Sequence, residues 1–413
     1  MSKIVLINIS GGDRPGLTSS LAEILASYRA RIVDIGQAVV HETLALAMLI
    51  EVSGNEEFTP LKKDLIVKAH DLELKIKFTP VSEESFSHWV RSQGKFRFVI
   101  SVLGRTITSE QFALVSAAIL GHGFNIDRIE RLSSRLSLTG RIENANACIE
   151  LEISSEKDES PGLRAALMAL THRFAIDIAF QRESIYRRNR RLVAFDMDST
   201  LIQAEVIDEL AKLHGVGKQV SAITAAAMRG ELDFKQSLTR RVELLRGLSA
   251  EKLQNLIHTV QLADGAERLI ATLKKLGYAT AILSGGFDFF GRHLQARLGI
   301  DYVFANDLEI VDGSLTGKLA SEIVDGKKKA ELLELIAQKE NISLDQVVAV
   351  GDGANDLPML NIAGMGIAFH AKPLVRQSAN HAVSHLGLDS ILYLLGVRDR
   401  DLDRAEFRSA RGN

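Results

Sequence analysis

Short apolar runs separated by helical patterns are the feature that most constrains the fold of this chain. The runs are four or five residues long and lie in the C-terminal half of the sequence: LVAF (192–195), ATAIL (279–283), YVFA (302–305), VVAV (347–350) and GIAF (366–369). Continuous apolar strands that alternate with helices are typical of a parallel sheet with helices on both faces. The sequence therefore predicts an α/β domain with a doubly wound parallel sheet over residues 190–396.

The connection between the first two runs is much longer than one crossover requires. Residues 196–278 lie between LVAF and ATAIL, and a helical pattern covers most of this stretch. We expect residues from about 206 to about 262 to form an inserted helical subdomain.

The N-terminal part of the chain contains a structural repeat. Residues 3–52 predict a strand, the Gly-rich loop SGGDRPG, an amphipathic helix and two more strands, and residues 96–153 repeat this order. We expect two small βαβ-type domains, at 1–82 and 95–181. The basic segment 182–191 (RESIYRRNRR) is interpreted as a solvated linker, in preference to a patch that binds phosphate or nucleic acid. The charged stretch 397–413 is expected to be a frayed tail.

Composition and charge narrow the classes of partner. Lys plus Arg number 50 and Asp plus Glu number 52, so no overall field attracts nucleic acid or an anionic membrane, and neither partner is expected. Cys148 is the only cysteine, which excludes an intrachain disulfide and a cysteine-based zinc site. The chain shows neither a secretory signal nor a run of about 20 apolar residues, and we expect a cytoplasmic protein.

Polar side chains follow the apolar runs at the points where the predicted strands end. The clusters are Asp196 with Asp198, the stretch Ser284-Gly285-Gly286, Asp352 with Asn355 and Asp356, and Lys329 at the start of a helix. Ligands of open parallel sheets bind at the carboxyl ends of the strands. Buried carboxylates are costly unless a cation or hydrogen bonds compensate them, and oxygen ligands without a His/Cys cluster favour Mg²⁺ over zinc.

These residue types together indicate phosphoryl transfer. A hydroxyl, backbone N–H groups at a helix start and a lysine suit phosphate oxygens. An aspartate can attack phosphorus to form an aspartyl-phosphate, and a second acid nearby can protonate the leaving alcohol and later activate water. The pattern predicts phosphomonoester hydrolysis.

The motifs DMDST, SGG, the helix at Lys329 and GDGAND resemble the four motifs of the haloacid dehalogenase superfamily. The stretches EVIDEL, AAMRGELDFKQSLTRRVELL, LSGGFD, FAND, DGSLTG and AVGDGANDLPML extend the resemblance to its phosphoserine phosphatase family, over residues 192–396. The two N-terminal repeats look like ferredoxin-like ACT domains. The resemblance implies a Rossmann-like fold and Mg²⁺-dependent hydrolysis of O-phospho-L-serine, the last step of serine biosynthesis.

The resemblance also implies roles for individual residues. Asp196 would be the nucleophile and Asp198 the general acid and base, with Mg²⁺ held by Asp196, the backbone carbonyl of Asp198, and Asp352. The phosphate contacts would be Ser284, Gly285 and Lys329. Asn355 and Asp356 would complete the surroundings of the metal and the phosphate. In the insert, which would form a cap, the implied substrate residues are Glu205 for the ammonium group, Arg241 for the carboxylate, and Met228 and Phe234 as walls.

Simpler interpretations exist for several of these residues. Asp198 is also a good helix N-cap, and charges such as Glu205 and Arg241 on predicted helices are usually solvated. Lys329 is the third of three lysines, and only the family register selects it. Two other functions remain open: a related phosphatase or phosphotransferase for another small phosphomonoester, and a non-catalytic amino-acid sensor.

The N-terminal repeats suggest regulation. Gly16 in the loop GGDRPG would let a small ligand approach the backbone, although Gly and Pro also mark ordinary turns. The second repeat keeps Gly104 but lacks the DRPG pattern. By the same resemblance we expect an amino-acid effector, serine by feedback logic, and a homodimer.

Overall fold

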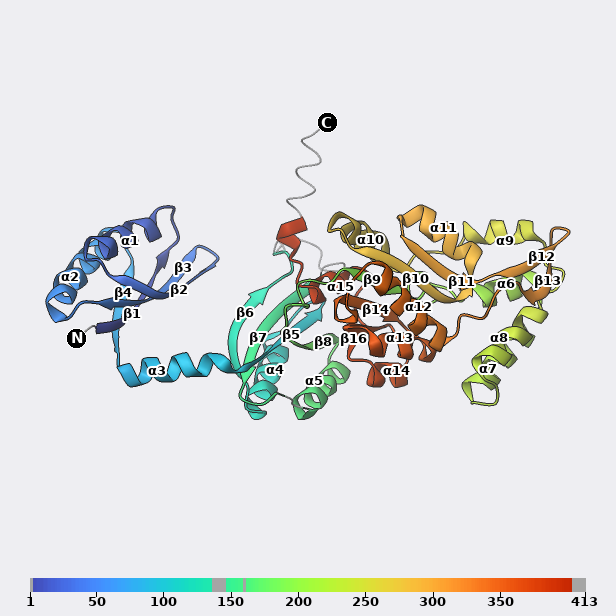
Figure 1. The fold of residues 1–413 in the computed structure, drawn as a ribbon, viewed down its shortest axis with the longest axis horizontal. Coiled ribbons are helices and arrows are strands. Elements are labelled where there is room, and N and C mark those ends of the chain that lie inside the picture. Colours follow the sequence, from blue (N-terminus) through green and yellow to red (C-terminus); the bar gives the residue numbers. More distant parts are fainter. Residues whose placement is uncertain (1–2, 136–145, 159–160, 403–413) are drawn as a thin grey trace, which may run out of the picture. The chain divides into compact units, whose positions relative to one another are not determined.

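The computed structural model describes residues 3–135, 146–158 and 161–402 (Figure 1). The chain forms two compact units, 1–95 and 96–413. The first unit holds the first repeat domain. The second unit holds the second repeat domain and the α/β domain.

The first repeat domain is a four-stranded antiparallel sheet in the order β2-β3-β1-β4, with two helices. Its elements are β1 (Lys3–Gly12), α1 (Leu17–Ser27), β2 (Arg31–Val40), β3 (Thr43–Val52), α2 (Asn55–Asp71) and β4 (Lys75–Val81). Alternate residues of β1 and β3 are buried, as the two-residue period of a half-buried strand requires. They pack against the apolar stripes of α1 and α2. Helix α3 (Glu83–Arg91) and η1 (Ser92–Gly94) follow.

The second repeat domain has the same topology, with the strand order β6-β7-β5-β8. Its elements are β5 (Phe96–Gly104), α4 (Ser109–Gly121), β6 (Asn125–Arg131), β7 (Ala147–Ser155), α5 (Pro161–Arg173) and β8 (Ile176–Arg182). Both domains therefore contain a further helix and strand beyond the strand-helix-strand-strand pattern described for 3–52 and 96–153. The added strand pairs with the first strand of its domain and is the fourth strand of each sheet.

The two glycines singled out in the repeats do not occupy equivalent positions. Gly16 is the N-cap of α1 with φ 90°, a left-handed conformation that favours glycine. Gly104 ends β5, where a Cβ would lie 3.0 Å from the Ile176 side chain. Gly11 has a similar environment in the first repeat domain, where a Cβ would lie 2.6 Å from the Leu74 side chain. Helix α4 is instead capped by Thr108, which forms a capping box with Gln111.

The α/β domain is built on a six-stranded parallel sheet in the order β11-β10-β9-β14-β15-β16. Its strands are β9 (Leu192–Phe195), β10 (Ala279–Phe287), β11 (Tyr302–Asn306), β14 (Val347–Gly351), β15 (Met365–Phe369) and β16 (His381–Val383). The main helices around it are α10 (Ala266–Lys275), α11 (Asp288–Leu298), α12 (Gly326–Lys339), α13 (Leu357–Ile362), α14 (Pro373–Ser378) and α15 (Ile391–Leu394). Short turns η2 (Leu344–Gln346), η3 (Ala354–Asp356) and η4 (Leu388–Ser390) complete it. The central strands β9, β14 and β15 are buried throughout because helices cover both faces.

Five helices lie between β9 and β10; the last, α10, packs against the sheet, and we call the first four the cap. They are α6 (Val206–His214), α7 (Gly217–Met228), α8 (Phe234–Glu243) and α9 (Ala250–Ile257). A hairpin of β12 (Leu308–Val311) and β13 (Ser314–Leu319) joins them, with β13 packed against α8. In Figure 1 the cap and hairpin extend beyond the edge of the sheet at β11.

The expectation that 182–191 is a solvated linker is wrong for two of its arginines. Arg187 is only 1% exposed and forms a buried ion pair with Glu150 of β7. Arg190 is also buried and donates a hydrogen bond to the Asp345 carbonyl oxygen of the α/β domain. A buried arginine requires such partners because desolvation penalises its charge. The segment therefore packs between the second repeat domain and the α/β domain.

The start of the charged C-terminal stretch is also packed rather than frayed. Asp399 is buried, accepts a hydrogen bond from the Ser134 amide at 2.6 Å and another from the Tyr393 hydroxyl. Arg398 and Arg400 both form ion pairs with Glu130 of β6. Residues 403–413 of the expected tail lie outside the described residues.

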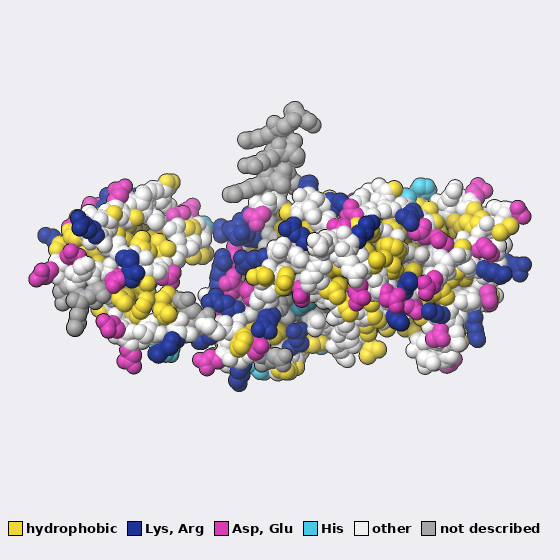
Figure 2. Space-filling view, viewed as in Figure 1, with side chains coloured by type: hydrophobic (Ala, Val, Ile, Leu, Met, Phe, Trp, Pro, Cys, Tyr) yellow, Lys and Arg dark blue, Asp and Glu magenta, His cyan; other side chains and the backbone are white. Residues whose placement is uncertain are grey.

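The charged side chains at the surface agree with the nearly equal numbers of acidic and basic residues in the sequence. Acidic and basic side chains intermingle over the face of the second unit that Figure 2 presents. Among the described residues, no helix has both the length and the apolar character needed to span a bilayer.

Candidate active site

The predicted polar clusters meet at the carboxyl ends of β9, β10 and β14. Apart from the fully buried Lys329 and Asp356, their residues line a pocket of about 820 Å³ whose opposite wall is formed by α7 and α8 of the cap. The order of the strands explains this convergence, because β9 lies between β10 and β14 in the sheet.

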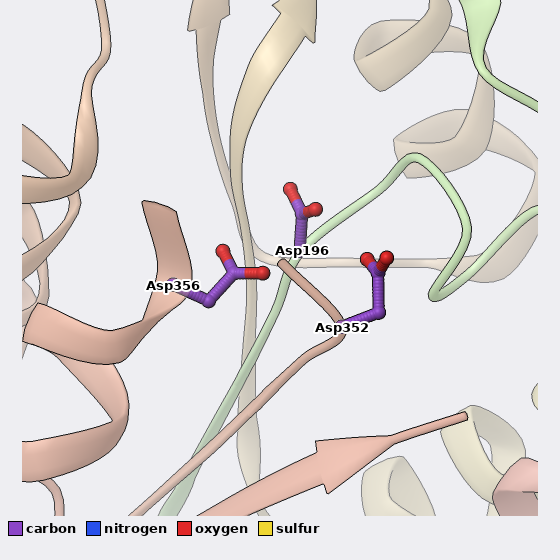
Figure 3. Close-up of side chains that lie close together, drawn as sticks. All are labelled: Asp196, Asp352 and Asp356. Carbon is purple, nitrogen blue, oxygen red and sulfur yellow. The ribbon is translucent and has the colours of Figure 1, made fainter. Parts of the chain in front are cut away.

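Three carboxylates converge beside the carboxyl ends of β9 and β14 (Figure 3). Asp196 follows β9, Asp352 follows β14, and Asp356 lies in η3. One oxygen of each lies within 4.8 Å of the others, which is close enough to share a cation. The sequence had placed Asp196 and Asp352 at the metal and Asp356 beside it.

Lys329 is the counterion of two of these acids. Its Nζ donates hydrogen bonds to Asp196 Oδ1 and to Asp356 Oδ1, each at 2.6 Å, and its side chain is fully buried. The neighbouring Lys327 and Lys328 instead pair with glutamates at the surface. Asp356 also accepts the Gly353 amide, so it holds Lys329 in place. The other oxygen of Asp196, Oδ2, does not take part in this bond, and Asp196 lines the pocket.

Asp198 has the environment of a proton donor. Burial, and then the nearby charges of Glu205 and Asp196, raise the pKa of its carboxyl group well above the usual range. Its Oδ1 also accepts the amide of Val206, the first residue of α6, at 3.4 Å. The simpler helix-capping interpretation therefore describes one contact of Asp198, while the N-cap position itself belongs to Glu205.

Asp352 is the acid that most clearly requires a cation. Burial and the charges of Asp196, Asp356 and Glu205 raise its pKa to about 8, against a weaker opposite effect of the Thr200 hydroxyl, which donates to Oδ1 at 3.2 Å. Lys329 compensates Asp196 and Asp356 but not Asp352. The donor set of three carboxylates suits a hard divalent ion such as Mg²⁺, and the residues present fit that ion.

The stretch 284–286 is shaped by close packing. Gly286 donates its amide to Ser284 Oγ at 2.9 Å. A Cβ at Gly285 would lie 2.8 Å from the Phe234 ring, and one at Gly286 would lie 2.6 Å from Asp198 Oδ2. Both glycines therefore let the cap and the acid approach the backbone.

Asn306 is a supporting residue that the sequence interpretation missed. It is fully buried at the end of β11, donates to the Gly285 carbonyl at 2.8 Å and accepts the Val324 amide at 2.8 Å. It thereby fixes the loop after β10 against the segment that leads to α12. The signal that the sequence offered for this residue was an amide side chain directly after the apolar run YVFA.

The cap places two opposite charges in the pocket. Glu205 accepts a hydrogen bond from the Ser199 hydroxyl at 2.9 Å, and burial, with a smaller effect of Asp196, raises its pKa. Arg241 is half-buried, and its Nε donates to the Ser237 carbonyl at 3.3 Å. Among the residues that the structure describes, no carboxylate forms an ion pair with Arg241. Its guanidinium is thus available to an anion in the pocket.

Three further predicted residues line the same pocket: Met228, Phe234 and Asn355. Met228 at the end of α7 is 65% exposed, so it is not the core residue that base rates would suggest. Phe234 opens α8 and is half-buried against Gly285. Of the predicted residues outside the two repeat domains, Lys329 and Asp356 do not line the pocket; both are fully buried and are bonded to each other.

Three parts of the chain match models of known families. Residues 190–364 match the haloacid dehalogenase-like hydrolase family, and residues 3–79 and 97–181 each match an ACT domain family.

Curated relatives span nearly the whole chain. A phosphoserine phosphatase of Streptomyces coelicolor is 43% identical over 404 residues, covering 97% of this chain and 94% of that protein. The phosphoserine phosphatase SerB2 of Mycobacterium tuberculosis is 38% identical over 97% of this chain and 95% of its own length.

Solved structures show the same relationship. A probable phosphoserine phosphatase from Vibrio cholerae is 35% identical with a TM-score of 0.56, over 72% of this chain and 86% of that one. A haloacid dehalogenase-family hydrolase from Salmonella enterica reaches a TM-score of 0.62 at 32% identity, over 72% of this chain and 98% of that one. The chain therefore belongs to the phosphoserine phosphatase family of haloacid dehalogenase-like hydrolases, and it carries two ACT domains before the hydrolase domain.

Proposed function

We propose that this protein hydrolyses O-phospho-L-serine to L-serine and phosphate, through a phosphorylated Asp196 and with Mg²⁺. The observation that carries the proposal is that one pocket has two carboxylates of the cluster on one side and the separate charges of Glu205 and Arg241 on the other. The names of the curated relatives support the same substrate. We place the reaction in the cytoplasm, as the last step of serine biosynthesis.

The first chemical step forms the aspartyl-phosphate. The Asp196 oxygen that Lys329 leaves free attacks phosphorus, and the bond between phosphorus and the serine oxygen breaks. Asp198, kept protonated by its raised pKa, gives its proton to that leaving oxygen, and L-serine is released. Lys329 is bonded to the other Asp196 oxygen and so orients the nucleophile.

The second step returns the enzyme to its starting state. Asp198, now a carboxylate, takes a proton from water, which attacks phosphorus and breaks its bond to Asp196. A Mg²⁺ ion, which Asp196, the Asp198 backbone carbonyl and Asp352 would hold, supplies charge neutralisation for the phosphoryl oxygens. Ser284, the amide of Gly285, and Asn355 are placed to bind those oxygens from the pocket wall.

Selectivity for phosphoserine follows from the charges of the cap. The substrate carries an ammonium group and a carboxylate, which Glu205 and Arg241 can each pair with. A phosphate ester that lacks either group leaves one of these charges unpaired, which costs binding energy. The function is tested by comparing turnover of phosphoserine, phosphothreonine and a sugar phosphate. Preferred hydrolysis of the sugar phosphate would favour the alternative substrate class, and no hydrolysis at all would favour a non-catalytic sensor.

Removal of the divalent metal should abolish activity without unfolding the protein. After treatment with EDTA we expect hydrolysis of phosphoserine to fall to background, because Asp352 and the attacking Asp196 lose the charge that compensates them. Excess Mg²⁺ should restore it, while circular dichroism stays unchanged. Full activity in EDTA would contradict the metal requirement.

Binding of Mg²⁺ should release a proton below about pH 8. In the metal-free protein the raised pKa of Asp352 keeps this acid protonated at lower pH, and a metal ligand must be deprotonated. The Mg²⁺ affinity should therefore weaken by up to about ten-fold per pH unit below that value. Calorimetry in buffers of different ionisation enthalpy measures the protons released. A proton count of zero at about pH 6.5 would contradict this assignment.

We further propose that the protein is a homodimer regulated by an amino acid. Strand β2 is one of the two edge strands of the first sheet, and its apolar residues Ile32, Ile35 and Val40 are 44%, 49% and 73% exposed. A long apolar edge strand is a template for pairing with a second copy. The loop at Gly16 is our candidate for contact with the effector, for which we propose serine; Gly104 is packed under Ile176 and offers a weaker case.

Sedimentation and serine titration test these proposals. Ile35→Asp should convert a dimer to a monomer, because it places a charge on the paired edge. Added serine should change phosphoserine turnover in the wild-type protein. A monomeric wild type, or turnover that is indifferent to serine, would contradict the respective proposal.

A further inference from the structure

Helix α14 forms part of the entrance to the pocket. Lys372, Leu374 and Val375, at the start of this short helix, line the pocket on the side of the α/β domain. Lys372 Nζ lies 4.0 Å from the sulfur of Met228, at the end of α7 in the cap. Leu374 and Met228 are 68% and 65% exposed, so each presents an apolar surface at the rim that a closing cap can cover.

The strand that follows α14 has little support within its own sheet. β16 is three residues long and is one of the two edge strands, paired only with β15 among the described strands. Strand β8 of the second repeat domain lies beside it (Figure 1). The free side of β16 therefore faces the second repeat domain.

Two side chains of the second repeat domain hold this segment at both ends. Arg164 of α5 donates a hydrogen bond to the Asn380 carbonyl, directly before β16, at 2.9 Å. Asp177 of β8 accepts the amides of Ser384 and His385, directly after β16, at 2.9 and 3.0 Å. These bonds join the second repeat domain to the backbone on each side of a three-residue strand.

Asp177 is an unusual residue for a purely structural contact. Its side chain is fully buried, and within the described residues it forms no ion pair with a lysine or arginine. The two backbone amides are therefore the groups that replace water around its charge. Such an arrangement is specific for one position of residues 384 and 385, because a displacement would leave the carboxylate unsatisfied.

We propose that Arg164 and Asp177 are positioning residues of the active site. They fix the backbone on either side of β16, and thereby hold α14 where Leu374 and Lys372 meet the cap when it closes over substrate. A change in the second repeat domain at α5 or β8 thus reaches the entrance of the pocket without touching the catalytic acids. The inference rests on the proposed phosphatase activity and goes beyond it, because it assigns a catalytic consequence to residues outside the hydrolase domain.

The test compares Arg164→Ala with a matched control on the same helix. Arg173 lies near the end of α5 and pairs with Glu110 within its own domain, so Arg173→Ala removes a similar side chain but no bond to β16. We expect Arg164→Ala to lower kcat/KM for phosphoserine by about five-fold or more, and Arg173→Ala to change it less than about two-fold. Arg164→Lys keeps a donor and should recover part of the loss.

A double-mutant cycle separates positioning from general destabilisation. If Arg164 acts through α14, then Leu374→Ala already removes the contact that it positions. The double variant Arg164→Ala/Leu374→Ala should then be about as active as Leu374→Ala alone. Asp177→Asn, which loses one of two acceptor oxygens, should behave in the same way if it folds.

Three results would overturn the inference. They are unchanged kcat/KM in Arg164→Ala, equal losses in Arg164→Ala and Arg173→Ala, and losses that simply multiply in the double variant. The wild-type protein, assayed in parallel on phosphoserine, shows whether the proposed function itself holds. An inactive wild type would refute the function, whereas an active wild type with insensitive variants would refute only this inference.

Discussion

Asp196→Asn is expected to lower turnover of phosphoserine by at least about 10³-fold while the protein stays folded. An amide is a very poor nucleophile for phosphorus, and the substitution also removes a charge from the metal cluster. The fold should persist because the Asn oxygen can still accept the hydrogen bond from Lys329, which keeps Asp356 as its ion pair. The measurement is steady-state turnover together with the melting temperature.

Asp312→Asn provides a matched control for this variant. Asp312 lies exposed in the turn of the β12–β13 hairpin with φ 49°, a conformation that Asn also adopts readily. The variant Asp312→Asn should therefore retain wild-type turnover. Substantial activity in Asp196→Asn, with comparable melting temperatures, would remove Asp196 from the reaction.

Arg241→Ala should separate phosphoserine from substrates that lack an amino-acid group. We expect kcat/KM for phosphoserine to fall by about 100-fold, because the substrate carboxylate would enter the pocket without its partner. Hydrolysis of p-nitrophenyl phosphate, which has no carboxylate, should change by less than about three-fold. The two substrates share the phosphoryl chemistry, so their ratio isolates the contribution of Arg241.

The neighbouring Arg240 is the control for this prediction. It lies on the same helix α8 but is exposed and does not line the pocket. Arg240→Ala should leave both substrates nearly unaffected. Equal losses on both substrates in Arg241→Ala would show that Arg241 does not bind the substrate carboxylate.

The sequence was most informative where strand ends carry polar residues. Asp196, Ser284 and Asp352 each follow a short apolar run, and the geometry of a parallel sheet brings such positions to one edge. Their convergence could be predicted from the chain without side-chain detail. The choice of Lys329 among three lysines needed the family register, and the structure shows that only this one is directed beneath the pocket.

Contacts between domains could not be predicted from local patterns. Arg187 and Arg190 lie in a basic segment that has the composition of a linker, yet both are buried through partners distant in sequence. Asp177 lies between the apolar residues Ile176 and Ile178 of its strand, and its contact with the segment after β16 explains its burial. Local periodicity reports which face of an element is buried but not which domain covers it.

Chemical trapping of the intermediate tests the central claim most directly. Borohydride reduces an aspartyl-phosphate to homoserine, and cleavage after Arg191 and Lys212 yields one peptide that contains both Asp196 and Asp198. With phosphoserine and Mg²⁺ present, fragmentation of this peptide should locate homoserine at position 196, and the product should be absent without substrate. Homoserine at position 198, or none at either position during active turnover, would contradict the proposal that Asp196 accepts the phosphoryl group.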